Sequence, residues 1–155
     1  MQIKSKLFGE IEIQDDKIIT FEHGIMGFEE LKKYALVFDS DKPTPNKIMW
    51  LQSAEISDLA FPVIDPTLIM GEYNPVVEDE WLAPIGGYET EEDLLVLCIL
   101  TVPSDISKMT ANVKAPLIIN GITKKGCQII ANNDEYSVRY NVYDILQKKK
   151  EEAGC

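Results

Sequence analysis

The residues of this chain that could do chemistry are mostly carboxylates, because histidine and cysteine are scarce. The single histidine, His23, precedes Gly24 in a predicted loop, a setting typical of a solvated turn residue rather than a catalytic base. The three cysteines, Cys98, Cys127 and Cys155, are widely separated and form no CxxC pair, which argues against a disulfide framework and a zinc site. We therefore expect no metal and no cofactor, two thiols in the core and a third on the C-terminal tail.

Motifs of the common enzyme classes are missing. The chain contains no GxSxG, P-loop, GxGxxG or HExxH. Paired carboxylates are abundant, so residue type alone leaves a two-carboxylate hydrolase open. Trp50, Trp81 and Tyr88 could stack on a sugar or base, which leaves open a β-barrel module that binds a small ligand. The acids cluster in predicted loops, where solvated charge is the ordinary state, so the sequence favours a non-enzymatic protein over both alternatives.

The net charge of −11 is concentrated in the middle of the chain. No Lys or Arg occurs between Lys47 and Lys108, although these 60 residues carry twelve acids. Such a surface repels phosphate backbones, which argues against direct nucleic-acid binding and favours a basic protein partner. Acids that serve only solubility would account for the total charge, but they explain the missing cations less well. The candidate protein-binding residues are the eight acids of residues 72–93: Glu72, Glu78, Asp79, Glu80, Glu89, Glu91, Glu92 and Asp93.

About ten short apolar or alternating segments predict an all-β fold, a small antiparallel β-barrel-like domain with one or two short helices and a C-terminal helix. The sequence predicts a hairpin turn at Asp15-Asp16, about one and a half helical turns over 29–34, a strand and a short helix within 75–87, and a final helix over 142–153. Turns are expected at 43–46, 120–121, 125–126 and 132–134. The expected strands cover 3–7, 11–13, 17–21, 34–39, 48–52, 59–65, 94–102, 110–116, 117–120, 128–131 and 137–142.

The length of 155 residues predicts one β domain over residues 1–145, followed by a charged C-terminal tail over residues 146–155. The longest apolar run, Leu94–Leu100, has seven residues and is too short to cross a bilayer. Within this run Cys98 and Ile99 are expected to be buried in a central strand. The first residues show no signal peptide, so we expect a cytoplasmic protein without a membrane association.

Four stretches resemble the FliW family of flagellar assembly factors, in the family's order and over nearly the whole chain. They are residues 8–13 with 18–21, residues 23–29, residues 50–53 through 59–66, and residues 110–120 with 126–130. Two departures are small: Met26 stands where members often have Pro, and Glu72-Tyr73 stands where they have Asp-Tyr. The residues that carry the resemblance include Gly24, Gly27, Phe28, Trp50, Gln52, Ser53, Asp65, Pro66, Asn112, Pro116 and Asn120.

The resemblance implies a β-barrel-like fold, no catalysis and two protein partners. It implies that the protein binds flagellin in the cytoplasm, and that it binds CsrA, the translational regulator that represses flagellin mRNA. Flagellin export would free the protein to bind CsrA away from its RNA surface and to relieve repression allosterically. An acidic segment held beside a basic RNA-binding dimer would disfavour RNA phosphates by repulsion. When free, the protein is expected to be a monomer.

Overall fold

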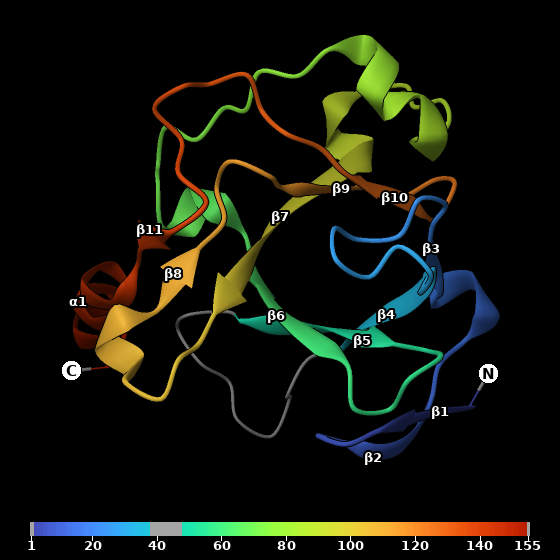
Figure 1. Ribbon diagram of the computed structural model, residues 1–155, viewed down its shortest axis with the longest axis horizontal. Coiled ribbons are helices and arrows are strands. Elements are labelled where there is room, and N and C mark those ends of the chain that lie inside the picture. The colour runs from blue at the N-terminus through green and yellow to red at the C-terminus, as the bar shows by residue number, and fades with distance from the viewer. Residues whose placement is uncertain (1, 38–47, 155) are drawn as a thin grey trace.

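The computed structural model describes residues 2–37 and 48–154, which fold around a closed barrel of seven strands (Figure 1). Around the barrel the order is β7-β6-β5-β4-β3-β10-β9, and a pairing between β7 and β9 closes the ring. Every neighbouring pair is antiparallel except β10 and β3, which run parallel. The barrel strands are β3 (Ile19–Phe21), β4 (Lys33–Val37), β5 (Met49–Ser53), β6 (Ala60–Ile64), β7 (Leu94–Thr101), β9 (Leu117–Asn120) and β10 (Lys125–Gln128).

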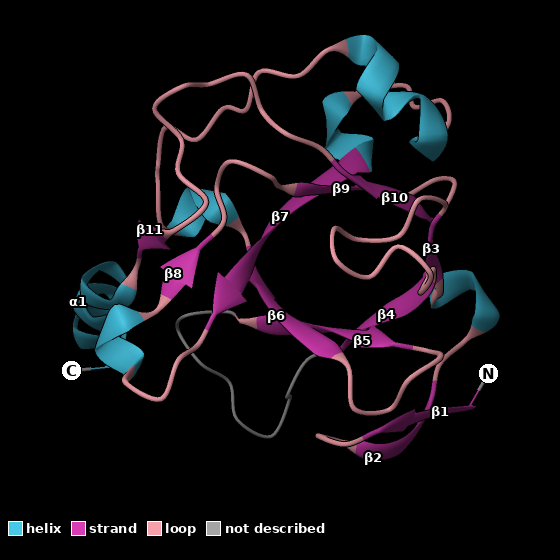
Figure 2. Cartoon of the chain, viewed as in Figure 1, coloured by secondary structure: helices cyan, strands magenta, loops and turns pink. Residues whose placement is uncertain are grey.

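The remaining elements are attached to the outside of this barrel (Figure 2). A hairpin of β1 (Gln2–Ser5) and β2 (Gly9–Glu12) forms a separate sheet, and β8 (Thr110–Ala111) joins β11 (Tyr140–Asn141) to β7. One α-helix, α1 (Tyr143–Gly154), ends the described chain. The all-β prediction with a C-terminal helix is confirmed. In the described residues, five 3-10 helices fill the connections: η1 (Asp15–Lys17), η2 (Pro66–Leu68), η3 (Asp79–Ile85), η4 (Glu91–Asp93) and η5 (Ile106–Lys108).

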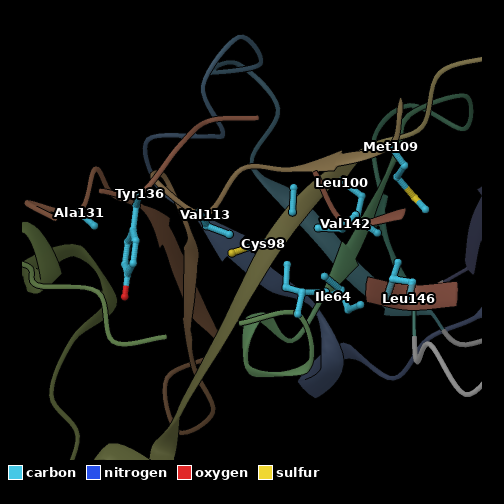
Figure 3. Close-up of a cluster of buried hydrophobic side chains, with 11 residues drawn as sticks. Ile64, Cys98, Leu100, Met109, Val113, Ala131, Tyr136, Val142 and Leu146 are labelled. Carbon is cyan, nitrogen blue, oxygen red and sulfur yellow. The ribbon is translucent and has the colours of Figure 1, made fainter. Parts of the chain in front are cut away.

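Three apolar clusters explain why the barrel strands are apolar on both faces. Six barrel strands contribute to the interior cluster, which includes Phe21, Leu51 and Leu97. A second cluster lies between β6–β8 and α1, where Cys98 and Leu100 from β7 meet buried residues of other elements (Figure 3). The third lies where η3 packs on β9 and β10. Because successive residues of β7 face different clusters, this strand is a continuous apolar run rather than an alternating one.

The predicted burial of Cys98 is confirmed, whereas Ile99 is only partly buried, at the border of the interior cluster. Burial raises the pKa of the Cys98 thiol to about 12, so this sulfur stays protonated and unreactive. Cys127 is also buried, as a member of the third cluster. Cys155 lies outside the described residues.

Two predictions near the N-terminus are wrong: the hairpin turn at Asp15-Asp16 and the helical segment over 29–34. Asp15-Asp16 does not join a hairpin, because β2 pairs with β1 while β3 pairs with β4 and β10, and η1 occupies the connection. Residues 29–30 form a turn and residues 31–32 have no regular secondary structure, so there is no helix here, and β4 begins at Lys33. A segment of six residues with Gly27 before it has too few internal hydrogen bonds to stabilise a helix by itself.

Three predictions in the second half of the chain are displaced. Lys125-Gly126 belongs to β10 and is not a turn; the turn falls at residues 121–124, with Lys124 at a φ of 60°. The strand expected over 110–116 is limited to β8, and no strand precedes η3 in residues 74–78. The expected turn at 43–46 lies outside the described residues.

The first turn of α1 belongs to the packed domain, because Leu146 is buried in the second cluster (Figure 3). The division into a β domain ending at 145 and a charged tail from 146 stays a prediction. No helix in the described part of the chain is long and apolar enough to cross a membrane.

The Tyr34 hydroxyl allows a test of hydrogen bonding in the barrel interior. Within the described residues it is a buried side-chain oxygen without a hydrogen-bond partner, and burial raises its pKa to about 12, so it stays protonated. We expect Tyr34→Phe to leave the free energy of unfolding unchanged or to raise it by up to about 2 kcal/mol, because an unpaired buried donor is removed while the ring packing stays. Urea unfolding measures the difference.

The matched control is Tyr73→Phe, since the Tyr73 hydroxyl donates to the Val113 carbonyl oxygen at 2.8 Å. Losing that bond should lower the free energy of unfolding by about 1 kcal/mol. A loss of stability in Tyr34→Phe equal to that of the control would contradict the assignment of Tyr34 as unpaired.

Candidate protein-binding surface

The eight candidate acids lie on one outer segment of the barrel, residues 72–93. All are exposed except Asp93, which is partly buried. The segment passes from the second cluster, where Tyr73 packs, to the third, where Ile85 at the end of η3 is fully buried. Its acids therefore occupy the exposed side of a segment whose apolar residues attach it to the barrel.

The structure separates the candidate acids by role. The Asp93 carboxylate accepts hydrogen bonds from the backbone N–H groups of Glu89 and Thr90, at 3.0 and 3.1 Å, so it shapes the turn before β7. Glu78 and Glu80 are close enough to share a hydrogen bond, and this bond and the repulsion from Glu78 raise the pKa of Glu80. Two exposed carboxylates held together in this way favour a cation between them.

The end of η3 is fixed to the barrel by side chains from β9 and the following turn. The Asn120 side-chain amide donates to the carbonyl oxygens of Ile85 and Gly87, each at 3.1 Å. The Thr123 hydroxyl donates to the Ile85 carbonyl oxygen at 2.6 Å. These hydrogen bonds therefore fix the acidic segment against the barrel.

A pocket of about 630 Å³ lies between η3 and the loop that follows β3. Met26 from the loop, Trp81 and Pro84 from η3, and Cys127 from β10 give it an apolar lining. Burial raises the pKa of the Cys127 thiol to about 11, which keeps this sulfur uncharged. The polar lining consists of His23, Glu29, Glu80 and Gln128, and Gly24 completes the wall.

The loop wall of the pocket is held by Gly24 and Gln128. Gly24 has a φ of 67°, and a Cβ at this residue would lie 2.5 Å from the Cα of Glu29, so only glycine fits. The Met26 N–H donates to the Gln128 side-chain oxygen at 2.8 Å, while the Gln128 amide donates to the Ala115 carbonyl oxygen at 3.1 Å. Both walls of the pocket are thus tied to barrel strands.

We expect Gly24→Ala to lower the free energy of unfolding by more than about 2 kcal/mol, because it combines a left-handed backbone with a clash against backbone atoms. Gly27→Ala is the matched control: Gly27 has a φ of 89°, but a Cβ there meets nothing within 4 Å. Its expected cost is about 1 kcal/mol, from the backbone conformation alone. Equal costs in chemical denaturation would contradict the close approach of Gly24 to Glu29.

The residues that carry the family resemblance are mainly structural. Gln52 and Ser53 are fully buried, and Asp65 caps η2 by accepting from the Thr67 N–H at 2.9 Å. The Asn112 side chain accepts from the Ala115 N–H at 2.9 Å. Pro66 and Pro116 are buried, Trp50 is partly buried, and the Phe28 ring packs edge-on against Phe61 with centroids 5.2 Å apart. Only Gly24 among them lines the pocket.

The sequence did not predict the pocket, although Glu80, one of the candidate binding residues, lines it. Met26, Trp81, Cys127 and Gln128 come from three separate parts of the chain. The available signal was Trp81, a large aromatic residue inside an acidic segment. In the described residues no three His, Cys, Asp or Glu side chains come together to hold a metal ion.

The geometry defines a small closed β-barrel protein with an acidic outer segment and a pocket lined by both apolar and polar side chains. The family model described as FliW protein matches residues 2–142. The flagellar assembly factor FliW of Lachnospira eligens is 51% identical over 150 residues, which cover 97% of this chain and 99% of that protein. The corresponding protein of Thermotoga maritima is 44% identical over 97% of this chain and 98% of its own length.

The fold is also that of a solved relative. A crystal structure of the flagellar assembly factor FliW superimposes with a TM-score of 0.81 at 31% identity, covering 92% of this chain and 97% of the other. The chain belongs to the FliW family of flagellar assembly factors.

Proposed function

We propose that the protein works in the cytoplasm without catalysis, by binding flagellin and the translational regulator CsrA in turn. Binding to CsrA would relieve repression of flagellin mRNA, and free flagellin would occupy the protein until it is exported. The family membership over nearly the full length supports this role, together with the resemblance of residues 8–130. Free protein is proposed to be a monomer that does not bind nucleic acid directly.

The acidic outer segment is the observation that carries the proposal. Residues 72–93 hold eight acids and no Lys or Arg, and seven of these acids are exposed. A basic RNA-binding protein is the kind of partner that such a surface attracts, and the same charge beside its RNA site repels phosphates. Flagellin needs no such complementarity, because apolar contacts and strand edges can hold it.

A two-carboxylate hydrolase is less well supported by the same acids. Glycosidases of this kind place the two carboxyl groups about 5–9.5 Å apart so that a sugar or water fits between them. Glu78 and Glu80 are both exposed, and only Glu80 lines the pocket, so these two carboxyl groups do not flank a substrate there.

Calorimetric titration with purified CsrA and, separately, with flagellin tests the proposal. We expect both to bind in reducing buffer, and we expect the affinity for CsrA to fall as salt rises, because the Debye length shrinks from about 10 Å at 0.1 M to about 3 Å at 1 M. Absence of binding to both proteins at low salt would overturn the proposed function.

A further inference from the structure

The pocket presents an exposed aromatic side chain that the fold itself does not use. Trp81 is 52% exposed and Met26, across the pocket, is 47% exposed. Neither side chain belongs to the three apolar clusters. Tryptophan is enriched among the residues that carry most of the binding energy at protein interfaces, where it anchors a partner in a desolvated pocket.

The pocket is already shaped before any partner arrives. Gln128 holds the loop wall through its bond to the Met26 N–H, and Asn120 with Thr123 holds the end of η3. A site with fixed walls loses little conformational entropy on binding, so its apolar contacts contribute more fully to affinity.

The charges around the pocket select the partner. Of its nine lining residues two are acids, Glu29 and Glu80, and none is Lys or Arg. Lys125, on the same strand as Cys127 and Gln128, is paired with Glu22 at 2.8 Å. Glu78, whose carboxyl group raises the pKa of Glu80, adds a further acidic group at the η3 side of the pocket. An apolar cavity with an acidic rim fits an apolar side chain that has a positive charge beside it.

We infer that the pocket seats an apolar side chain of the basic protein partner, from a segment in which Lys or Arg stands next to that side chain. The apolar group would contact Trp81 and Met26, and the cation would lie between Glu29 and Glu80. This inference rests on the proposed function. It assigns the pocket to CsrA rather than to flagellin, because a basic partner is complementary in charge to Glu29 and Glu80.

The fluorescence of Trp81 reports whether the pocket is occupied. In a Trp50→Phe background it is the sole tryptophan of the chain, so its emission reports this site alone. We expect addition of CsrA to shift the Trp81 emission to shorter wavelength, since the ring passes from water into an apolar contact. Flagellin, added alone, should leave the emission unchanged at concentrations that saturate binding.

Two pocket variants and two matched controls test the contact energetically. Trp81→Ala and Glu80→Gln should each weaken CsrA binding, the first by about tenfold or more and the second by a few-fold. Ile106→Ala and Glu135→Gln change residues of similar exposure away from the pocket, and they should leave binding within about twofold. Circular dichroism and urea unfolding establish that each variant is folded.

Unchanged CsrA affinity in folded Trp81→Ala, or an unshifted Trp81 emission at saturation, overturns the inference and leaves the proposed function intact. Loss of flagellin binding alone overturns the assignment of the occupant. A small molecule that raises the melting temperature and shifts the emission while CsrA does not would place a small ligand in the pocket instead. If the unmodified protein binds neither protein, the proposed function fails and the inference fails with it.

Discussion

Reversal of Glu78, Asp79 and Glu80 together to lysine is expected to slow association with CsrA by about tenfold or more at low salt, because steering by opposite charges raises association rates by one to three orders of magnitude. The three residues are exposed and adjacent at the start of η3, and Glu78 already raises the pKa of Glu80 by its proximity. Single neutralisations should change the association rate by at most a few-fold, since an exposed charge pair contributes roughly 0.2–1 kcal/mol. Stopped-flow or surface-based association kinetics at low and high salt measure the effect.

The control is a second triple reversal with the same change in net charge. Glu10, Asp134 and Glu135 are exposed acids outside the acidic segment, so their change to lysine alters the total charge without altering this surface. The reversal in the segment should slow association far more than the control, and high salt should remove the difference between them. If both triple variants associate at the same rate, only the total charge matters and the segment serves solubility.

Gln52→Ala is expected to lower the free energy of unfolding by about 3–5 kcal/mol, because it leaves several buried polar groups without partners. Gln52 is fully buried on β5. Its side-chain oxygen accepts from the Ser5 hydroxyl at 2.8 Å, and its amide nitrogen donates to the carbonyl oxygens of Ser53 at 3.0 Å and Leu59 at 3.1 Å. One side chain thus connects the β1–β2 hairpin, β5 and the turn before β6.

Gln14→Ala provides the comparison, since Gln14 is exposed and makes no side-chain cap to η1. A surface change of this kind should stay within about 0.5 kcal/mol. Denaturant unfolding followed by circular dichroism gives both values. A loss below about 1 kcal/mol in Gln52→Ala would contradict the network as a determinant of stability.

The barrel was predictable because its strands are short, apolar and separated by turn residues, as in β7 and β9. The local errors arose where a residue type has two uses. Lys125-Gly126 has the composition of a turn, but Gly126 lies in β10, where glycine is required because a Cβ would come within 2.6 Å of the Phe21 ring. Asp15-Asp16 has the composition of a hairpin turn, but it connects strands of two different sheets.

The charge of the candidate surface was predictable from the sequence, and its shape was not. A run of acids is visible in the sequence, and the structure places it on an exposed outer segment. The pocket depends on the parallel pairing of β3 with β10, which carries the loop with Met26 to the η3 segment with Trp81. Contacts of this kind join residues far apart in the chain, and neither periodicity nor composition encodes them.

The most direct test is a release experiment with CsrA bound to a labelled leader of flagellin mRNA. Fluorescence anisotropy should fall when the protein is added, because the CsrA–protein complex gives up its RNA, and it should recover when excess flagellin is added. The triple lysine variant should release less RNA at equal concentration. Labelled RNA that stays bound to CsrA at saturating protein, or RNA that binds to the protein itself, would contradict the account.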